Sequence, residues 1–336
     1  MTHRLERRRP TSWLLIGCAL LLGACNRGAS PEATDPSPAS VRLFAGLNDP
    51  KDKNIAVNMF IPQRAKVVVG ANVAWTFNGP EPHTVTFVPA GQQIPAPSAP
   101  GATEAKGSPG PFDGTTLVSS GILPQGTLTG GFNLTFTKAG TYNYVCILHP
   151  AMRGSIEVVT TPNAESRQDI RKRGMSERDR WLSEGRDAKK KYLETAAKTV
   201  RNSDGTTTHT IGMGTSTEHA AVLAFQPVKA DIKPGDKVIF LNSDILPHSA
   251  TFAGSTQLPQ NPESPQARNA APGPSPQTLN ATGFFNTGWL PPNAPPGAGP
   301  PEAARSFTFV VPTAGTYGYV CILHGPSGQA GSIVAA

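Results

Sequence analysis

The sequence predicts an all-β fold in which two similar Greek-key β-sandwich domains are joined by a helical spacer. The first observation is that the phrase Ala-Gly-Thr-Tyr-x-Tyr-Val-Cys-Ile-Leu-His occurs twice, ending at His149 and again at His324. The second is that short segments rich in β-branched and aromatic residues, such as residues 73–77 and 132–136, are bounded by Gly, Pro and Asn. Because these segments do not alternate with helical patterns, they favour sandwiches over a parallel α/β sheet.

The duplication extends well beyond this phrase. Shifted by 165 positions, residues 54–87 lie over residues 219–252 without a gap. The Cys-containing phrases align at an offset of 175, so the second copy has ten more residues between its first His and its Cys. A repeat of this size predicts two complete domains rather than a solenoid of short units. We place the first domain at residues 41–160 and the second at residues 200–336.

Residues 161–199 differ in composition from the two copies and predict a charged helical spacer. Ser176 opens a sequence typical of a capping box, and a shorter helix over residues 163–173 is expected to end at Gly174. An apolar stripe at helical spacing is expected to pack against a β domain. The alternative, a basic helix lying on a membrane, is opposed by acidic residues throughout the segment. The stripe consists of Trp181, Gly185, Ala188, Tyr192 and Ala196.

The N-terminus has the pattern of an export signal. A basic head precedes an apolar run over residues 13–22, which is too short to span a bilayer comfortably. Residues 22–25 read Leu-Gly-Ala-Cys and resemble the lipobox of bacterial lipoproteins. That resemblance implies a lipoprotein signal peptide over residues 1–24, lipidation of Cys25 and a flexible tether over residues 25–40. The protein would then be exported and lipid-anchored to a membrane, facing the periplasm or the cell exterior. Ordinary cleavage nearby is the alternative, and it would make Cys25 incidental.

The charge pattern gives no sign of a nucleic-acid partner. The formal net charge is +7, and removing residues 1–24, which carry four Arg and one Glu, leaves +4. Most of the remaining basic excess lies in residues 164–201. A solvated helix face explains it better than a nucleic-acid-binding stripe.

Each copy contains one cysteine, a histidine three residues after it, and another histidine about seventy residues upstream. A disulfide between the copies is one alternative, but it would leave the histidines unexplained. Two imidazoles and a thiolate brought together suit copper in a blue electron-transfer site, with a weak fourth ligand. Thiolate stabilises Cu(I) and imidazole also accommodates Cu(II), so such a set can hold copper in both oxidation states. Because each copy has one set, we expect two copper ions. The predicted sets are His83, Cys146 and His149 in the first copy, and His248, Cys321 and His324 in the second.

With these residues the chain resembles the blue copper proteins (cupredoxins) of the plastocyanin and amicyanin kind. The resemblance covers both copies but neither the spacer nor the signal. In the first copy, Cys-x-x-His-x-x-Met is similar to the short amicyanin ligand loop, which implies Met152 as the axial ligand. In the second copy, Gln329 stands five residues after the last His, at the spacing of plastocyanin-like loops. Glutamine is the axial ligand in the stellacyanin branch of the family.

The resemblance also implies details of each site. Thr84 and Ser249 stand where plastocyanins and amicyanins commonly carry Asn, so the tether between the two ligand loops is in doubt. The C-terminal His of each site is expected to expose its ring edge through an apolar patch, as in relatives. The axial difference implies a higher reduction potential at the Met152 site.

Three functions compete. The resemblance implies a tandem carrier of single electrons, not an enzyme, whose partners are redox proteins such as a cytochrome or a membrane oxidoreductase. A two-domain multicopper oxidase or nitrite reductase would need further His ligands, usually as His-x-His, and the sequence has no such pair. Copper buffering or delivery would favour many Met and Cys, and the chain has five and four. A copper-loading site formed by His209, Met213 and His219 is less favoured than scattered surface residues.

Overall fold

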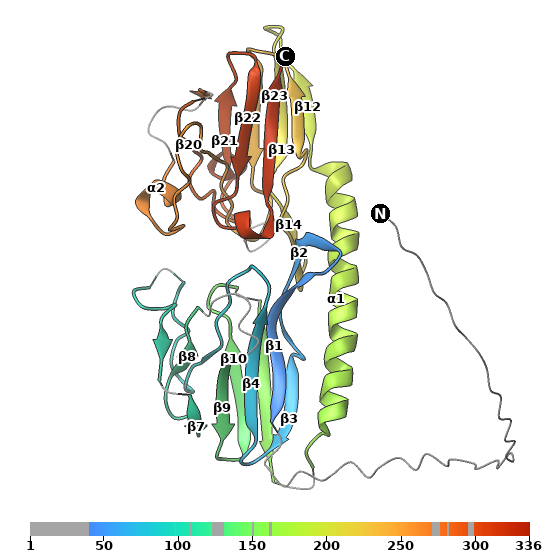
Figure 1. Cartoon of the computed structure of the whole chain (residues 1–336), viewed down its shortest axis with the longest axis vertical. Helices are drawn as coiled ribbons and strands as arrows, with labels where there is room; N and C mark the ends of the chain where they lie inside the picture. The colour runs from blue at the N-terminus through green and yellow to red at the C-terminus, as the bar shows by residue number, and fades with distance from the viewer. Residues whose placement is uncertain are drawn as a thin grey trace, which may run out of the picture. The chain divides into compact units, whose positions relative to one another are not determined.

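The structure is a computed structural model that describes residues 40–97, 99–107, 109–122, 131–149, 151–160, 163–270, 276–280, 282–294 and 299–336. Within these ranges most regular structure is β-strand, which confirms the all-β fold class (Figure 1). The predicted signal peptide, Cys25 and all but the last residue of the predicted tether lie outside the described residues. No helix among the described residues is long and apolar enough to cross a membrane.

The first copy contributes to two sheets that enclose one hydrophobic core. Leu43 and Trp75 from one sheet lie in the same buried cluster as Tyr144 and Ile156 from the other. The seven-stranded sheet has the order β14 (Thr215–Ser216), β15 (Ala220–Val222), β2 (Asp52–Ile61), β1 (Val41–Asp49), β4 (Asn72–Asn78), β9 (Phe132–Phe136) and β7 (Gly110–Phe112). The six-stranded sheet has the order β3 (Arg64–Val68), β11 (Arg153–Val159), β10 (Gly140–Val145), β5 (Thr86–Phe87), β8 (Val118–Ser120) and β6 (Ala105–Lys106).

The second copy forms a similar pair of sheets around a core that contains Phe240, Phe309 and Tyr319. One sheet has the order β12 (Lys198–Arg201), β13 (Thr207–Gly212), β17 (Lys237–Leu241), β21 (Ser306–Val310) and β19 (Gln277–Thr278). The other has the order β16 (Lys229–Ile232), β23 (Ala330–Ala335), β22 (Gly315–Val320), β18 (Thr251–Phe252) and β20 (Phe285–Asn286). Short helical turns complete this copy: α2 (Pro265–Arg268), η1 (Glu302–Arg305) and η2 (Gly325–Ser327).

One long helix, α1 (Arg167–Thr195), occupies most of the predicted spacer. Ser166 caps the helix by accepting a hydrogen bond from the Asp169 N–H. The predicted break at Gly174 is wrong, because the helix continues through this residue. A Cβ here would come within 2.9 Å of Pro62 Cδ, so the glycine allows the helix to approach the end of β2 closely.

The predicted apolar stripe of the helix is confirmed as its buried face. Trp181 lies in one hydrophobic cluster with Val57 of β2, and Tyr192 lies in another with Val222 of β15. The Tyr192 hydroxyl also donates a hydrogen bond to the Ala224 carbonyl oxygen. The helix therefore packs against strands from both copies (Figure 1).

The two copies meet through a shared strand pair within one compact unit. Strand β15 lies inside the predicted second domain but pairs with β2 in the first copy's sheet, where Ala56 faces Ala221. These alanines are equivalent by the offset of 165 positions. The flanking hydrogen bonds, which are also equivalent, join Asn58 N–H to His219 O at 3.1 Å and Leu223 N–H to Asn54 O at 2.7 Å. The contact is therefore isologous, as in a two-fold dimer.

Candidate metal centres

Strands β10 and β5 bring the first set of predicted ligands together. Val145 pairs with Thr86, so Cys146, which follows β10, lies near His83, which precedes β5. The Cys146 Sγ atom lies 3.9 Å from His83 Nδ1 and 3.5 Å from His149 Nδ1. All three side chains are buried, and their candidate ligand atoms lie within 4.8 Å of one another.

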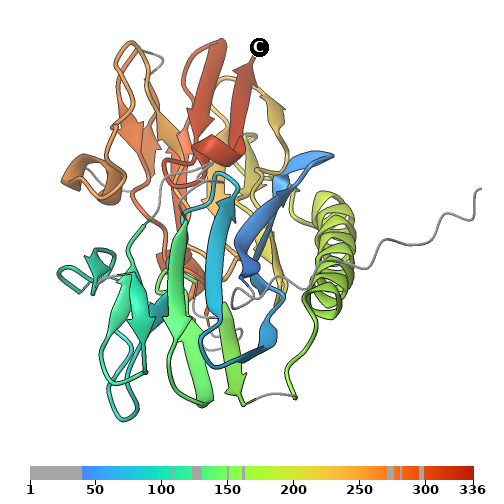
Figure 2. The ribbon, with the colours of Figure 1, turned by 60° about the horizontal axis from the view of Figure 1, so that its bottom comes forward.

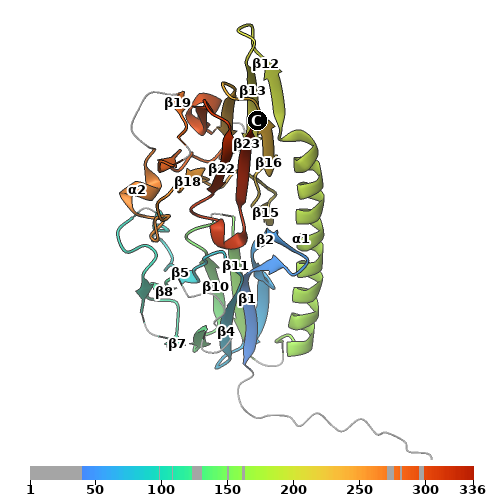
Figure 3. The same ribbon diagram turned by 45° about the horizontal axis from the view of Figure 1, so that its top comes forward.

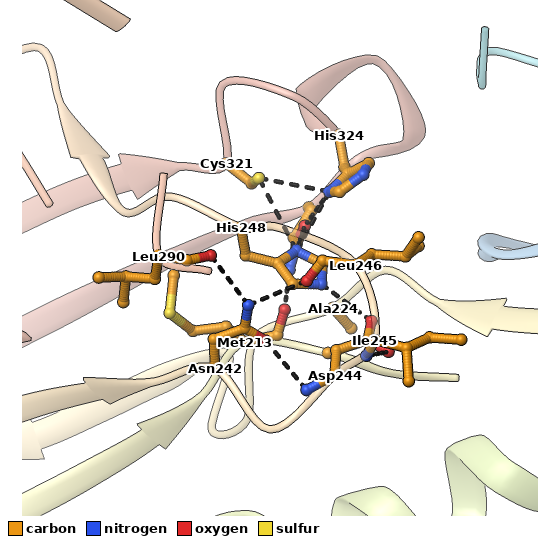
Figure 4. Close-up of polar contacts among 12 residues, drawn as sticks. Met213, Ala224, Asn242, Asp244, Ile245, Leu246, His248, Leu290, Cys321 and His324 are labelled. Carbon is orange, nitrogen blue, oxygen red and sulfur yellow. Dashed lines mark hydrogen bonds and ion pairs between the residues drawn. The ribbon is translucent and has the colours of Figure 1, made fainter. Parts of the chain in front are cut away.

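The second copy repeats this construction with strands β22 and β18. Thr251 pairs with Val320, which places Cys321 near His248. Cys321 Sγ lies 3.9 Å from His248 Nδ1 and 3.4 Å from His324 Nδ1. The two Nδ1 atoms are 3.1 Å apart, so all three donor atoms converge (Figure 4).

The donors in each cluster fit copper. Cys146 and Cys321 are both free and buried, so the alternative of a disulfide between the copies is wrong. Each cluster offers one sulfur and two imidazole nitrogens, all on buried side chains. This is the trigonal donor set, softened by a thiolate, that favours copper.

The amide oxygen of Gln329 lies against the histidines of the second cluster. The side chain is fully buried, and its Oε1 lies 3.0 Å from His248 Nδ1 and 3.1 Å from His324 Nδ1. Its Nε2 donates to the Met213 carbonyl oxygen, and this bond turns the amide oxygen toward the other donors. The geometry therefore supports Gln329 as the fourth ligand.

Met152 occupies the corresponding loop of the first site. The side chain is fully buried and lies in the same hydrophobic cluster as Cys146. The Cys146 N–H donates to the Met152 carbonyl oxygen at 3.0 Å, and the Met152 N–H donates to the His149 carbonyl oxygen at 2.9 Å. These bonds fold the short loop back on itself and keep Met152 close to Cys146 and His149.

The tether between the ligand loops is present in both sites, although neither site has the Asn that plastocyanins and amicyanins commonly carry at this position. Thr84 Oγ1 accepts a hydrogen bond from the Ile147 N–H at 2.9 Å. Ser249 Oγ accepts one from the Ile322 N–H, also at 2.9 Å. The two residues also donate their own N–H groups to the cysteine sulfurs at 3.4 Å. The short hydroxyls suffice because the strand pairing already brings the loops close.

The histidines of the two sites differ in what contacts their outer nitrogens. His248 Nε2 lies 2.9 Å from Asp244 Oδ2 (Figure 4). His324 Nε2 lies 3.7 Å from Oε2 of Glu81, a residue of the first copy. Among the described residues, no carboxylate oxygen lies within 4.0 Å of a ring nitrogen of either first-site histidine. Sequence reasoning missed both carboxylates: only the Asp244-to-His248 spacing offered a signal, and Glu81 offered none.

The ligands of the two sites therefore differ in their pKa values, and those of the first site favour the uncharged forms. Burial, and then the charge of His149, holds the pKa of His83 well below its ordinary value. Burial, and then the charge of His324, lowers the pKa of His149 to about 3. Burial also raises the pKa of the Cys146 thiol. Without metal, the first site therefore holds a thiol and neutral imidazoles.

In the second site, neighbouring charges outweigh burial. Desolvation alone would lower the pKa of His248, but the hydrogen bonds with Asp244 and Cys321 raise it to about 10. Desolvation would likewise raise the pKa of Cys321, yet the charges and hydrogen bonds of His324 and His248 hold it well below its ordinary value. Without metal, this site therefore favours a thiolate beside imidazolium.

The C-terminal histidines are much less exposed than the expected open ring edge implies. His149 is 7 % exposed and His324 is 6 % exposed, so both residues are buried. Glu81, itself buried, covers the outer nitrogen of His324.

The other candidate residues lie outside both clusters. His209 contacts Asp236 and His219 contacts Glu184, in each case through a ring nitrogen and a carboxylate oxygen. Met213 is fully buried in the second core, so it is not the surface residue that we expected. None of the three candidates joins a His/Cys/His set among the described residues.

The paired sandwiches and their two buried sets of one cysteine and two histidines define a cupredoxin-like protein. The chain is similar to amicyanin from Paracoccus denitrificans, with 26 % identity over an alignment of 151 residues that covers 43 % of this chain and 92 % of amicyanin. No protein-family profile matches the chain. A Cu(I) structure of an amicyanin variant is similar at 14 % identity and a TM-score of 0.24, covering 38 % of this chain and 82 % of that one. A mutant fern plastocyanin is similar at 23 % identity and a TM-score of 0.23, covering 35 % of this chain and 100 % of that one.

Proposed function

We propose that the chain is an exported electron-transfer protein that carries two mononuclear blue (type 1) copper sites and passes single electrons between redox partners. The observation that carries this proposal is the convergence, twice, of a buried sulfur and two imidazole nitrogens. Copper bound there would supply reversible one-electron chemistry between Cu(I) and Cu(II). The first site would be held by His83, Cys146, His149 and Met152, and the second by His248, Cys321, His324 and Gln329.

The protein's own residues would keep each site rigid and dry. The ligands sit on paired strands, the loops are tethered by Thr84 and Ser249, and every predicted ligand is buried. A fixed pocket of this kind suits an electron carrier, because both oxidation states can use one geometry. The similarity to amicyanin supports the carrier over a copper oxidase.

Copper loading followed by metal counting, visible spectroscopy and EPR tests the proposal. We expect two copper ions per chain, each with intense thiolate-to-copper absorption. Cys146→Ser and Cys321→Ser should each remove one site and leave the other. Full blue colour in the double variant would show that the ligand assignment is wrong.

We further propose that lipidated Cys25 anchors the protein to a membrane, where it meets a cytochrome or a membrane oxidoreductase. This proposal rests on the lipobox-like residues 22–25. Cys25→Ser should move the protein from the membrane fraction to the soluble fraction of the producing cells. Unchanged membrane retention would contradict the anchor.

A further inference from the structure

Glu81 belongs to the first copy but lies against the second site. The residue precedes the first-site ligand His83 by two positions, and its side chain is only 5 % exposed. Its Oε2 lies 3.7 Å from the outer nitrogen of His324. Its Oε1 accepts a hydrogen bond from the hydroxyl of Ser327, which is fully buried. Both carboxylate oxygens are thus directed at the ligand loop of the other copy.

The first copy also holds the backbone of that loop. Asn54 Nδ2 donates to the Ser327 carbonyl oxygen at 3.2 Å. The Lys53 side chain lies so close to Gly328 that a Cβ on the glycine would collide with it. In Figures 2 and 3 the blue β1–β2 hairpin accordingly lies beside the red turn η2. The loop between His324 and Gln329 is therefore packed against the first copy.

The first site has no counterpart to this carboxylate. The offset of 165 positions makes Leu246 the equivalent of Glu81. Leu246 packs in an apolar cluster with Ala56 and Ala221, at the centre of the contact between the copies. The contact between the copies is symmetric in its backbone, but it places a carboxylate, that of Glu81, beside the second site only.

We propose that Glu81 is a positioning residue for the second copper site, supplied by the opposite copy. This inference rests on the proposed function. A carboxylate beside the outer nitrogen of a ligating histidine favours one ring orientation and makes the other nitrogen a better donor. Ser327 holds the carboxylate in place by a hydrogen bond, and the carboxylate charge, 3.7 Å from Nε2, favours the ring orientation in which Nδ1 of His324 faces the other donors. Its negative charge also favours Cu(II) over Cu(I), so it lowers the reduction potential of this site.

Redox titration in a Cys146→Ser background tests this role, because only the second site is then measured. We expect Glu81→Gln to shift the Cu(II)/Cu(I) equilibrium about tenfold toward Cu(I), which is about 59 mV for one electron. Ser327→Ala should shift it in the same direction by less. Glu157→Gln is the matched control, since that carboxylate is 51 % exposed and pairs with Lys66. A second readout is the set of imidazole nitrogen chemical shifts of His324 in metal-free protein. Glu81→Gln and Ser327→Ala should change these shifts, and Glu157→Gln should not.

The outcomes separate the two proposals. Absence of thiolate-to-copper absorption in the Cys146→Ser protein would contradict the proposed function itself. Normal absorption with the same midpoint in Glu81→Gln and Glu157→Gln would overturn the role of Glu81 alone. Should Glu81→Gln not fold, as judged by circular dichroism, an unshifted midpoint in Ser327→Ala would overturn it instead.

Discussion

The two candidate metal centres share their inner construction and differ in their surroundings. In both, a strand pair sets the cysteine near one histidine, a hydroxyl ties the ligand loops, and an N–H reaches the sulfur. Among the described residues no carboxylate oxygen lies within 4.0 Å of a first-site ring nitrogen, whereas two carboxylates contact the histidines of the second site. The comparison indicates that strand pairing builds the metal pocket and that a few neighbouring side chains tune it.

The differences all act in the same direction on the reduction potential. The amide oxygen of Gln329 is a harder donor than a thioether and favours Cu(II). Asp244 and Glu81 add negative charge near the second site, which also favours Cu(II). We therefore expect the first site to have the higher potential, so that an electron shared by the two sites settles in the first copy.

The largest expected effect is on copper affinity after Asp244→Asn. Losing the charge that holds His248 should weaken copper binding at the second site by about 10- to 100-fold. The first site should keep its affinity, because Asp244 acts on His248 of the second site. The equivalent position in the first copy is Gly79, which has no carboxylate. Chelator competition on Cys146→Ser and Cys321→Ser proteins measures each site separately. Asp231→Asn, at a carboxylate that is 69 % exposed, is the control, and equal weakening at both sites would contradict the comparison.

A smaller effect is expected on the midpoints of the two single-site proteins. Cys321→Ser reports the first site and Cys146→Ser the second, and the first should be higher by about 59 mV or more, a tenfold change in the one-electron equilibrium. Gln329→Met should raise the second midpoint and narrow the gap. The axial explanation fails if the second site proves equal or higher and Gln329→Met leaves its midpoint unmoved.

The smallest expected effect is on the free energy of unfolding, after removal of the hydroxyl that ties the ligand loops together in each site. Thr84→Ala and Ser249→Ala each leave a backbone N–H without its hydroxyl partner in the interior, which should cost about 1–3 kcal/mol of unfolding free energy. Because the bonds have equal length, we expect similar losses in denaturant titrations of metal-free protein. Markedly unequal losses would show that the two tethers are not equivalent.

The fold class and the converging ligand sets could be predicted because they depend on local patterns. Repeated segments, strand alternation and the Cys-x-x-His spacing all lie within each copy. The continuity of the helix at Gly174 could not be predicted, since it depends on the distance to Pro62. The tether was doubted for a similar reason: the reach that Thr84 needs is set by the loops around it. Glu81 was missed because its role arises only where the copies dock.

The isologous pair at Ala56 and Ala221 has a consequence for the history of the chain. A contact between equivalent residues is the contact that two identical subunits make in a two-fold dimer. Joining such subunits into one polypeptide preserves the contact and frees each half to mutate alone. In a homodimer every substitution appears twice, so a glutamate at position 81 would have faced both sites. With Leu246 at the equivalent position, the fused chain can keep this carboxylate beside one site and an apolar side chain in its place on the other side of the contact.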